Sequence, residues 1–150
     1  MSEPIEILLV EDNPNDLELT LHALEKHNLA NKIHIVRDGE EALDFLFCRG
    51  AFSSRTFEAP PKVVLLDLKL PKVDGLEILR TVKADTRTKA VPIVVMTSSK
   101  QQRDLVESYQ LGVNSYIQKP INFQEFQEVI RQLGYYWLAI NQPPPAGAFK

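Results

Sequence analysis

Short apolar runs alternate with amphipathic stretches along most of the chain. Apolar runs of this length that are rich in Val, Ile and Leu are typical of buried strands, because they are too short for helices. Five such runs lie at residues 5–10, 32–36, 62–66, 91–96 and 114–118. The pattern therefore predicts five strands with other structure between them.

The segments between the runs carry apolar residues at helical spacing, which predicts helices packed against a core. Asn13 can cap the first helix and Pro14 suits its first turn, while Gly112 can end the fourth. The expected helices cover residues 14–27, 38–47, 75–84, 100–111 and 122–140. The last helix is expected to bury one apolar stripe, formed by Phe123, Phe126, Val129, Ile130, Leu133, Trp137 and Ile140.

Regular alternation of strand and helix favours an α/β fold in which helices cover both faces of a parallel sheet. We expect a doubly wound, flavodoxin-like sheet of five strands in the order 2-1-3-4-5, with five helices. This unit spans residues 1–140, with a loop at 49–61, and a proline-rich tail follows at 141–150. Its consecutive prolines favour an extended backbone over a sixth helix.

Composition narrows the classes of function. The formal net charge of -3 offers no broad attraction to nucleic acid or to an anionic membrane. No apolar stretch approaches the roughly 20 residues of a membrane span, and the first residues lack the basic start of a signal peptide. The single cysteine, Cys48, excludes an internal disulfide. We therefore expect a cytoplasmic protein without nucleic-acid or membrane partners.

Polar side chains that could bind a ligand or take part in a reaction lie at the ends of four of the predicted strands. Ligands of open α/β sheets bind at the carboxyl ends of the strands, near the point where the strand order reverses. In the order 2-1-3-4-5, the first, third, fourth and fifth strands are contiguous, so we expect their end residues to converge. These are Glu11 and Asp12 after the first strand, Asp67 after the third, Thr97 at the end of the fourth and Lys119 after the fifth.

Three carboxylates held together repel one another unless a cation neutralises them. Ligands that are all oxygen suit a hard cation, and few carboxylates with room for water favour Mg²⁺ over Ca²⁺. Lys119 and Thr97 add a positive charge and a hydroxyl beside Asp67. Such a set can stabilise a transferring phosphoryl group, so the residues predict formation of an aspartyl phosphate.

Four segments resemble the signatures of response-regulator receiver domains in two-component signalling: "LLVEDNPND", "VVLLDLKLPKVDG", "VPIVVMTSS" and "NSYIQKP". They occur in the order of that family, and the resemblance spans residues 5–140. The long loop before the third strand and the "LPKVDG" segment are most similar to small regulators that work with cyanobacterial phytochrome histidine kinases. The resemblance implies a response regulator that is phosphorylated by a partner histidine kinase.

Carried over by position, the resemblance implies that Asp67 is the phosphoacceptor and that it binds Mg²⁺ together with Asp12. The backbone carbonyl of Lys69 would complete the protein ligands, and Glu11 would act through water. Thr97 and Lys119 would contact the phosphoryl oxygens.

The resemblance also implies a conformational switch near the end of the fifth strand. Phosphorylation would draw in Thr97, and Tyr116 would swing inward behind it, although an aromatic residue in a strand can also be ordinary core. Pro120 would follow a cis peptide bond. The fourth helix, fifth strand and fifth helix would then present a changed face, which we also expect to support a homodimer.

Other functions remain as alternatives. An aspartate-nucleophile phosphatase needs a second Asp two residues after the nucleophile, where this chain has Lys69. A dinucleotide-binding domain needs a glycine-rich turn that is absent after the first strand. A non-phosphorylated interaction module of the same fold would not need the acidic residues, Thr97 and Lys119 together. We therefore expect a signalling protein and not a metabolic enzyme.

Overall fold

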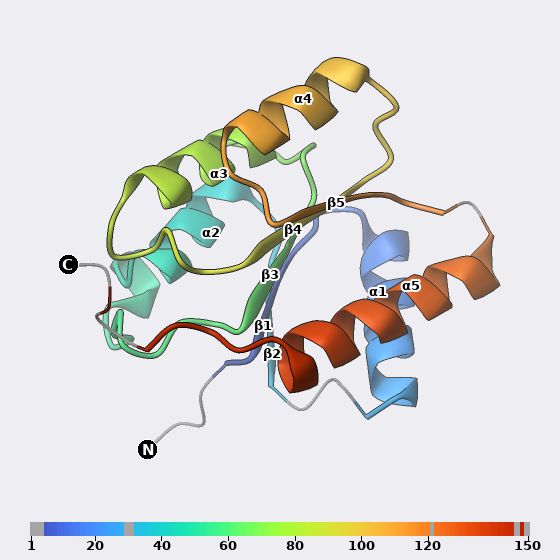
Figure 1. The fold of residues 1–150 in the computed structure, drawn as a ribbon, viewed down its shortest axis with the longest axis horizontal. Coiled ribbons are helices and arrows are strands. Elements are labelled where there is room, and N and C mark those ends of the chain that lie inside the picture. The colour runs from blue at the N-terminus through green and yellow to red at the C-terminus, as the bar shows by residue number, and fades with distance from the viewer. Residues whose placement is uncertain (1–4, 29–31, 121, 146–147, 149–150) are drawn as a thin grey trace.

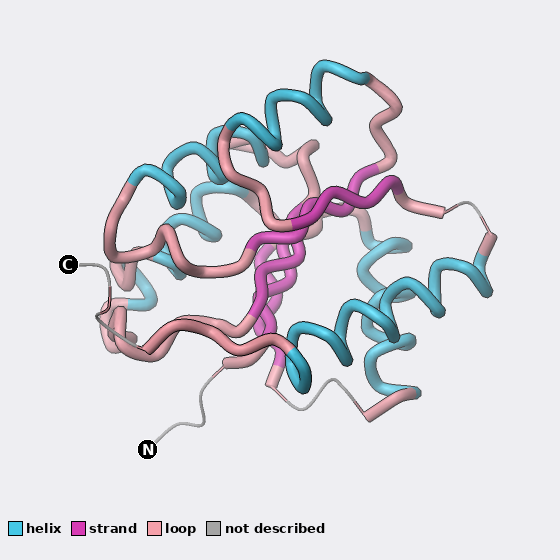
Figure 2. The backbone as a smooth tube through the Cα atoms, viewed as in Figure 1, coloured by secondary structure: helices cyan, strands magenta, loops and turns pink. Residues whose placement is uncertain are grey.

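The computed structural model describes residues 5–28, 32–120, 122–145 and 148, and it contains the predicted sheet (Figures 1 and 2). The strands run in the order β2-β1-β3-β4-β5, and every neighbouring pair is parallel. The strand bounds are β1 Ile7–Val10, β2 Ile33–Val36, β3 Val63–Leu66, β4 Ile93–Thr97 and β5 Ser115–Gln118. The expected fold class and strand order are confirmed.

Five α-helices connect or follow the strands, as expected. Their bounds are α1 Pro14–Lys26, α2 Gly39–Leu46, α3 Gly75–Ala84, α4 Gln102–Gln110 and α5 Phe123–Tyr135. The Asn13 side chain accepts hydrogen bonds from two backbone amides of the first turn of α1, and Pro14 opens that helix. Asp38, Asp74 and Asn122 cap α2, α3 and α5 in the same way. Short polar side chains thus satisfy helix ends that the backbone leaves open.

The helices form one layer on each face of the sheet (Figure 1). α1 and α5 pack on one face, and α2, α3 and α4 cover the other. Two apolar clusters fill the spaces between these layers. In β1 and β3 every residue is buried, because each side chain of a central strand meets one of the two clusters.

The apolar stripe predicted for the last helix is partly wrong. Phe126 and Ile130 are buried as expected, but Phe123 is 47% exposed and Ile140 is 50% exposed. Phe123 is the first residue of α5, where the helix begins beyond the sheet. Ile140 ends a π-helical turn, η2 (Tyr136–Ile140), whose wider winding rotates it off the α-helical stripe.

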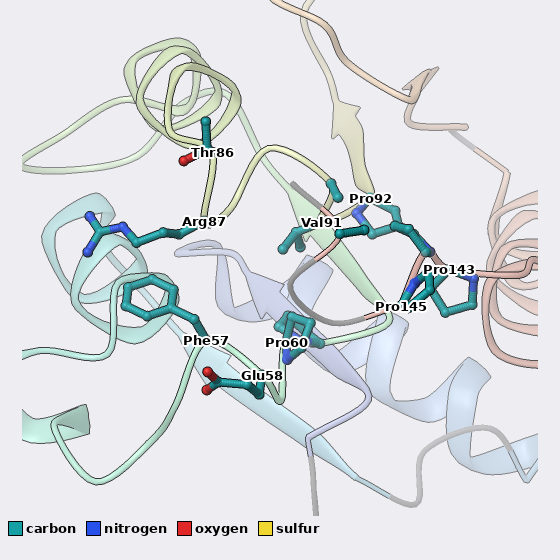
Figure 3. A pocket seen from close by; sticks show the side chains of 13 residues that line it. Phe57, Glu58, Pro60, Thr86, Arg87, Val91, Pro92, Pro143 and Pro145 are labelled. Atoms are coloured by element: carbon teal, nitrogen blue, oxygen red, sulfur yellow. The ribbon is translucent and has the colours of Figure 1, made fainter. Parts of the chain in front are cut away.

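The loop before β3 and the proline tail both pack on the body of the protein. The Arg55 guanidinium lies over the Phe45 ring and donates to the carbonyl oxygens of Phe45 and Ala59, which anchors the loop that includes η1 (Gly50–Phe52). The described tail residues are not helical, and Pro143 and Pro145 line a cavity of about 390 Å³ (Figure 3). In the part of the chain that the structure describes, no helix has the length and apolarity to span a bilayer.

Candidate metal centre

The predicted site residues meet at the carboxyl edge of the sheet because the backbone pairing continues one residue beyond the strands. The amide of Asp67 donates to the carbonyl oxygen of Val10 (3.1 Å), and the amide of Lys119 donates to that of Thr97 (2.7 Å). The residues just beyond neighbouring strands therefore lie at the same height along the strand direction. The convergence expected from the strand order is confirmed.

Glu11, Asp12 and Asp67 form an acidic cluster at this edge. Each offers one carboxylate oxygen, and these oxygens lie within 4.8 Å of one another. Glu11 is 4% exposed and Asp67 is 8% exposed, whereas Asp12 faces solvent. Two carboxylates of the cluster are thus shielded from water, and the third is open to it. Donors that are all oxygen, in a site open to water, suit a hard divalent cation that retains water ligands.

The charge at the cluster is only partly compensated by the protein. Burial raises the pKa of Glu11 to about 8, and the adjacent Asp67 adds to this effect while Lys119 opposes it. The negative charge of Glu11 is therefore disfavoured at this position. A divalent ion would neutralise that charge, so the donor set fits the metal implied by the sequence.

Lys119 is the cation of the site. Its Nζ donates to Glu11 Oε1 (2.7 Å), Asp16 Oδ2 (2.7 Å) and Asp67 Oδ2 (3.0 Å), and its side chain is 8% exposed. Burial alone would lower the pKa of Lys119, but the hydrogen bonds that it donates to Asp16 and Glu11 and the charge of Asp67 outweigh this effect and raise the pKa. Lys119 is therefore a permanently charged group against Asp67.

The turn after Asp67 shapes the open side of the site. The amide of Lys69 donates to Asp67 Oδ1 (3.1 Å), and Lys69 and Asp12 both line a cavity of about 360 Å³. A Cβ on Gly75 would lie 2.5 Å from the carbonyl oxygen of Asp67. Only glycine therefore lets the start of α3 approach Asp67 so closely.

The two predicted switch residues lie on neighbouring strands, Thr97 at the end of β4 and Tyr116 in β5. Thr97 is fully buried, and its Oγ1 accepts a hydrogen bond from the amide of Ser99 (3.1 Å). Tyr116 packs partly against the core, and its hydroxyl is buried without a hydrogen bond of normal geometry. Burial and then the charge of Asp104 raise the pKa of Tyr116, and Ser99 lowers it in part. Tyr116 thus lies with its hydroxyl turned inward.

The prediction of a cis peptide bond before Pro120 is wrong. Among the described residues the backbone contains no cis peptide bond, so Lys119 and Pro120 are joined in trans. Trans is the intrinsically favoured form of such bonds by about 0.5–1 kcal/mol, and a proline after a strand does not by itself require the other isomer.

Sequence reasoning missed three polar side chains around the site, namely Asp16, Ser99 and Asp104. Asp16 lies in the first turn of α1, three residues after its cap, and this position alone could have placed it near the strand ends. Asp104 and Ser108 are the buried residues of α4. Their four-residue spacing was the available signal that the inner side of this helix is polar.

Comparison with known proteins shows what this chain is similar to. The model of the response regulator receiver domain matches residues 7–131. The probable methanogenesis regulatory protein FilR2 of Methanothrix harundinacea is 40% identical, with 95% of this chain and 89% of FilR2 covered. Response regulator Rcp1 of Synechocystis is 35% identical, with 95% of each chain covered.

Solved structures resemble the protein over nearly its whole length. The phosphorylated cyanobacterial phytochrome response regulator RcpA superposes with a TM-score of 0.86 at 35% identity, covering 95% of this chain and 99% of RcpA. The Mn²⁺-bound form of Rcp1 gives 0.85 at 35% identity, covering 94% and 99%. The bacteriophytochrome response regulator AtBRR gives 0.73 at 53% identity, covering 94% and 100%.

Proposed function

The chain belongs to the response regulator receiver family, and from this premise we propose that Asp67 accepts a phosphoryl group from a phosphohistidine of a partner histidine kinase. In this transfer the phosphorus–nitrogen bond of the donor breaks and a bond from phosphorus to a carboxylate oxygen of Asp67 forms. The observation that carries the proposal is the position of Asp67. Its carboxylate is buried, yet it lies 3.0 Å from the Lys119 ammonium and borders an open acidic cluster.

The surrounding residues have separate roles in this proposal. Lys119 neutralises charge on the incoming phosphoryl oxygens, and Glu11 and Asp16 keep its ammonium in place. Thr97 donates its hydroxyl to a phosphoryl oxygen, and the amide of Ser99, which donates to its Oγ1, orients that hydroxyl. Tyr116 follows the movement of Thr97 and passes the change to the surface of α4, β5 and α5.

Members of this family bind a divalent metal, as the Mn²⁺-bound Rcp1 structure illustrates. We propose Mg²⁺ as the ion, held by Asp12, Asp67 and the backbone carbonyl of Lys69, with Glu11 acting through water. When bound, it would offset the negative charge that gathers between Asp67 and the phosphoryl group. The acidic cluster and the shared cavity of Asp12 and Lys69 support this assignment.

The protein is a signalling protein, and we propose that its only chemistry is on itself. It catalyses its own phosphorylation from a phosphodonor and slowly hydrolyses the product. Turnover of external phosphate esters is not favoured, because the position of the general acid in aspartate-nucleophile phosphatases is taken here by the exposed Lys69.

Two relatives indicate the kind of partner. RcpA and AtBRR are described as phytochrome and bacteriophytochrome response regulators, so we propose a phytochrome-type histidine kinase acting in the cytoplasm as the phosphodonor. We also propose a homodimer through α4, β5 and α5. Val106, Tyr109 and Tyr135 support it, since each side chain is about half exposed and apolar or aromatic. Sedimentation as a monomer at high concentration, with and without phosphorylation, would contradict the dimer.

The central experiment is phosphorylation of Asp67 by acetyl phosphate with Mg²⁺, followed by mass spectrometry of the intact protein. We expect one phosphoryl group on the wild type and none on Asp67→Asn. Asp85→Asn is the matched control, because Asp85 lies away from the site and pairs with Arg87. Equal modification of Asp67→Asn would show that another residue is the acceptor.

A further inference from the structure

Helix α4 buries polar residues and exposes apolar ones. Asp104 is 6% exposed and Ser108 is fully buried, while Val106 and Tyr109 are 48% and 57% exposed. A helix on a core normally does the reverse, since a buried polar group costs free energy unless it is hydrogen-bonded. The polar layer beneath α4 therefore calls for an explanation beyond packing.

Hydrogen bonds connect this polar layer to the site. The Ser99 hydroxyl donates to Asp104 Oδ2 (2.6 Å) and accepts from the amide of Gln101 (3.2 Å). The amide of Ser99 in turn donates to Thr97 Oγ1 (3.1 Å). Asp104 also lines the cavity that is lined by Asp12 and Lys69. One carboxylate of α4 thus fixes the loop that orients the Thr97 hydroxyl.

Two hydroxyls in the same layer are unsatisfied. Among the described residues, the buried side-chain oxygens of Ser108 and Tyr116 have no hydrogen-bond partner. Burial and then the charge of Asp104 raise the pKa of Tyr116, while the side chain of Ser99 lowers it, so the Ser99 hydroxyl that donates to Asp104 also lies near the Tyr116 hydroxyl. A carboxylate can accept several hydrogen bonds, so Asp104 is an available acceptor for a group that now lacks one.

We infer that Asp104 is a positioning residue of the switch, whose carboxylate holds Ser99 in one arrangement and the Tyr116 hydroxyl in the other. Exchanging one hydroxyl donor for another keeps the number of hydrogen bonds constant, so the two arrangements differ little in free energy. A bistable element of this kind can be biased by a local event at Thr97. Because Asp104 is part of α4, the exchange moves the exposed apolar side of that helix.

This inference rests on the proposed function, and a spectroscopic experiment separates the two. Fluorotyrosine is incorporated, the Tyr116 resonance is assigned with Tyr116→Phe, and ¹⁹F spectra are recorded with Mg²⁺ before and after acetyl phosphate. We expect Asp104→Asn and Ser99→Ala to shift the Tyr116 resonance before phosphorylation and to remove most of the change that phosphorylation produces in the wild type. A merely structural role would alter the resonance before phosphorylation at most, and it would leave the change that phosphorylation produces at its wild-type size.

The controls make both outcomes decisive. Glu107→Gln changes an exposed charge on the same helix and should retain wild-type spectra. The shift expected before phosphorylation should also appear in an Asp67→Asn background, so it remains observable if Asp67 is not the acceptor. If Asp104→Asn does not fold, Ser99→Ala removes the same hydrogen bond from the loop side. Wild-type Tyr116 spectra in folded Ser99→Ala and Asp104→Asn would overturn the inference.

Discussion

Two lysines near opposite ends of β4 and β5 form the same number of hydrogen bonds in contrasting surroundings. At the carboxyl edge, the Lys119 ammonium donates to three carboxylates. At the amino edge, the Lys83 ammonium donates to three neutral oxygens, the carbonyls of Lys89 (3.0 Å) and Val91 (2.8 Å) and the side chain of Asn114 (2.9 Å). The two lysines therefore differ in the charge of their partners and not in how many partners they have.

The difference appears in their titration. Burial lowers the pKa of Lys83 to about 8, because neutral acceptors offset little of the cost of removing its charge from water. The carboxylates around Lys119 reverse that effect. At the amino edge a lysine ties α3 to the starts of β4 and β5, whereas at the carboxyl edge a lysine holds three carboxylates together. Hydrogen-bond counts alone would not distinguish these roles.

The largest expected effect comes from truncating each lysine in turn. Lys119→Ala removes the charge that faces Asp67, and we expect phosphorylation by acetyl phosphate to slow by about 100-fold or more. Lys83→Ala should phosphorylate at nearly the wild-type rate. The rates are measured by intact-protein mass spectrometry with saturating Mg²⁺. Similar rates in the two variants would show that the contrast between the edges has no functional meaning.

For stability, we expect Lys83 to matter more than it does for phosphorylation. Lys83→Met keeps most of the aliphatic chain but removes the donor to the partly buried carbonyl oxygen of Val91, so we expect the free energy of unfolding to fall by about 1–3 kcal/mol. Urea unfolding measures the change, and the phosphorylation rate of the same variant should be unaffected. A stable but poorly phosphorylated Lys83→Met would assign a functional role to the amino edge.

A smaller effect concerns the charge of Glu11 at the carboxyl edge, and it should appear in how stabilisation by Mg²⁺ depends on pH. The pKa of Glu11 is raised to about 8, so the stability that comes from its protonated form is present below about pH 4.5 and is lost as the pH rises through about 8. Mg²⁺ no longer competes with that proton at high pH. We therefore expect Mg²⁺ to raise the melting temperature by more at about pH 9 than at about pH 6, by a few degrees. Glu11→Gln should abolish the difference between the two pH values, and its persistence would exclude Glu11 as the cause.

Much of the fold could be predicted because strand and helix patterns are local. The β-branched runs and the cap Asn13 depend on neighbouring residues only, and parallel pairing then brings Glu11, Asp67 and Lys119 to one edge. The contact between Lys119 and Asp16 joins residues far apart in the sequence, and no local pattern encodes it. Likewise, the burial of Asp104 depends on how α4 lies against the sheet. Phe123 and Ile140 are exposed because they lie at the two ends of a long helical segment, where fewer residues of the protein cover it.

The contact of Lys119 with Glu11 spans 108 positions along the chain. During synthesis, the acidic residues leave the ribosome well before the lysine that neutralises them. A chain that stops before β5 would therefore contain the carboxylates without the lysine that offsets their charge. The acidic cluster and its cation form one site only after the last strand has paired with β4.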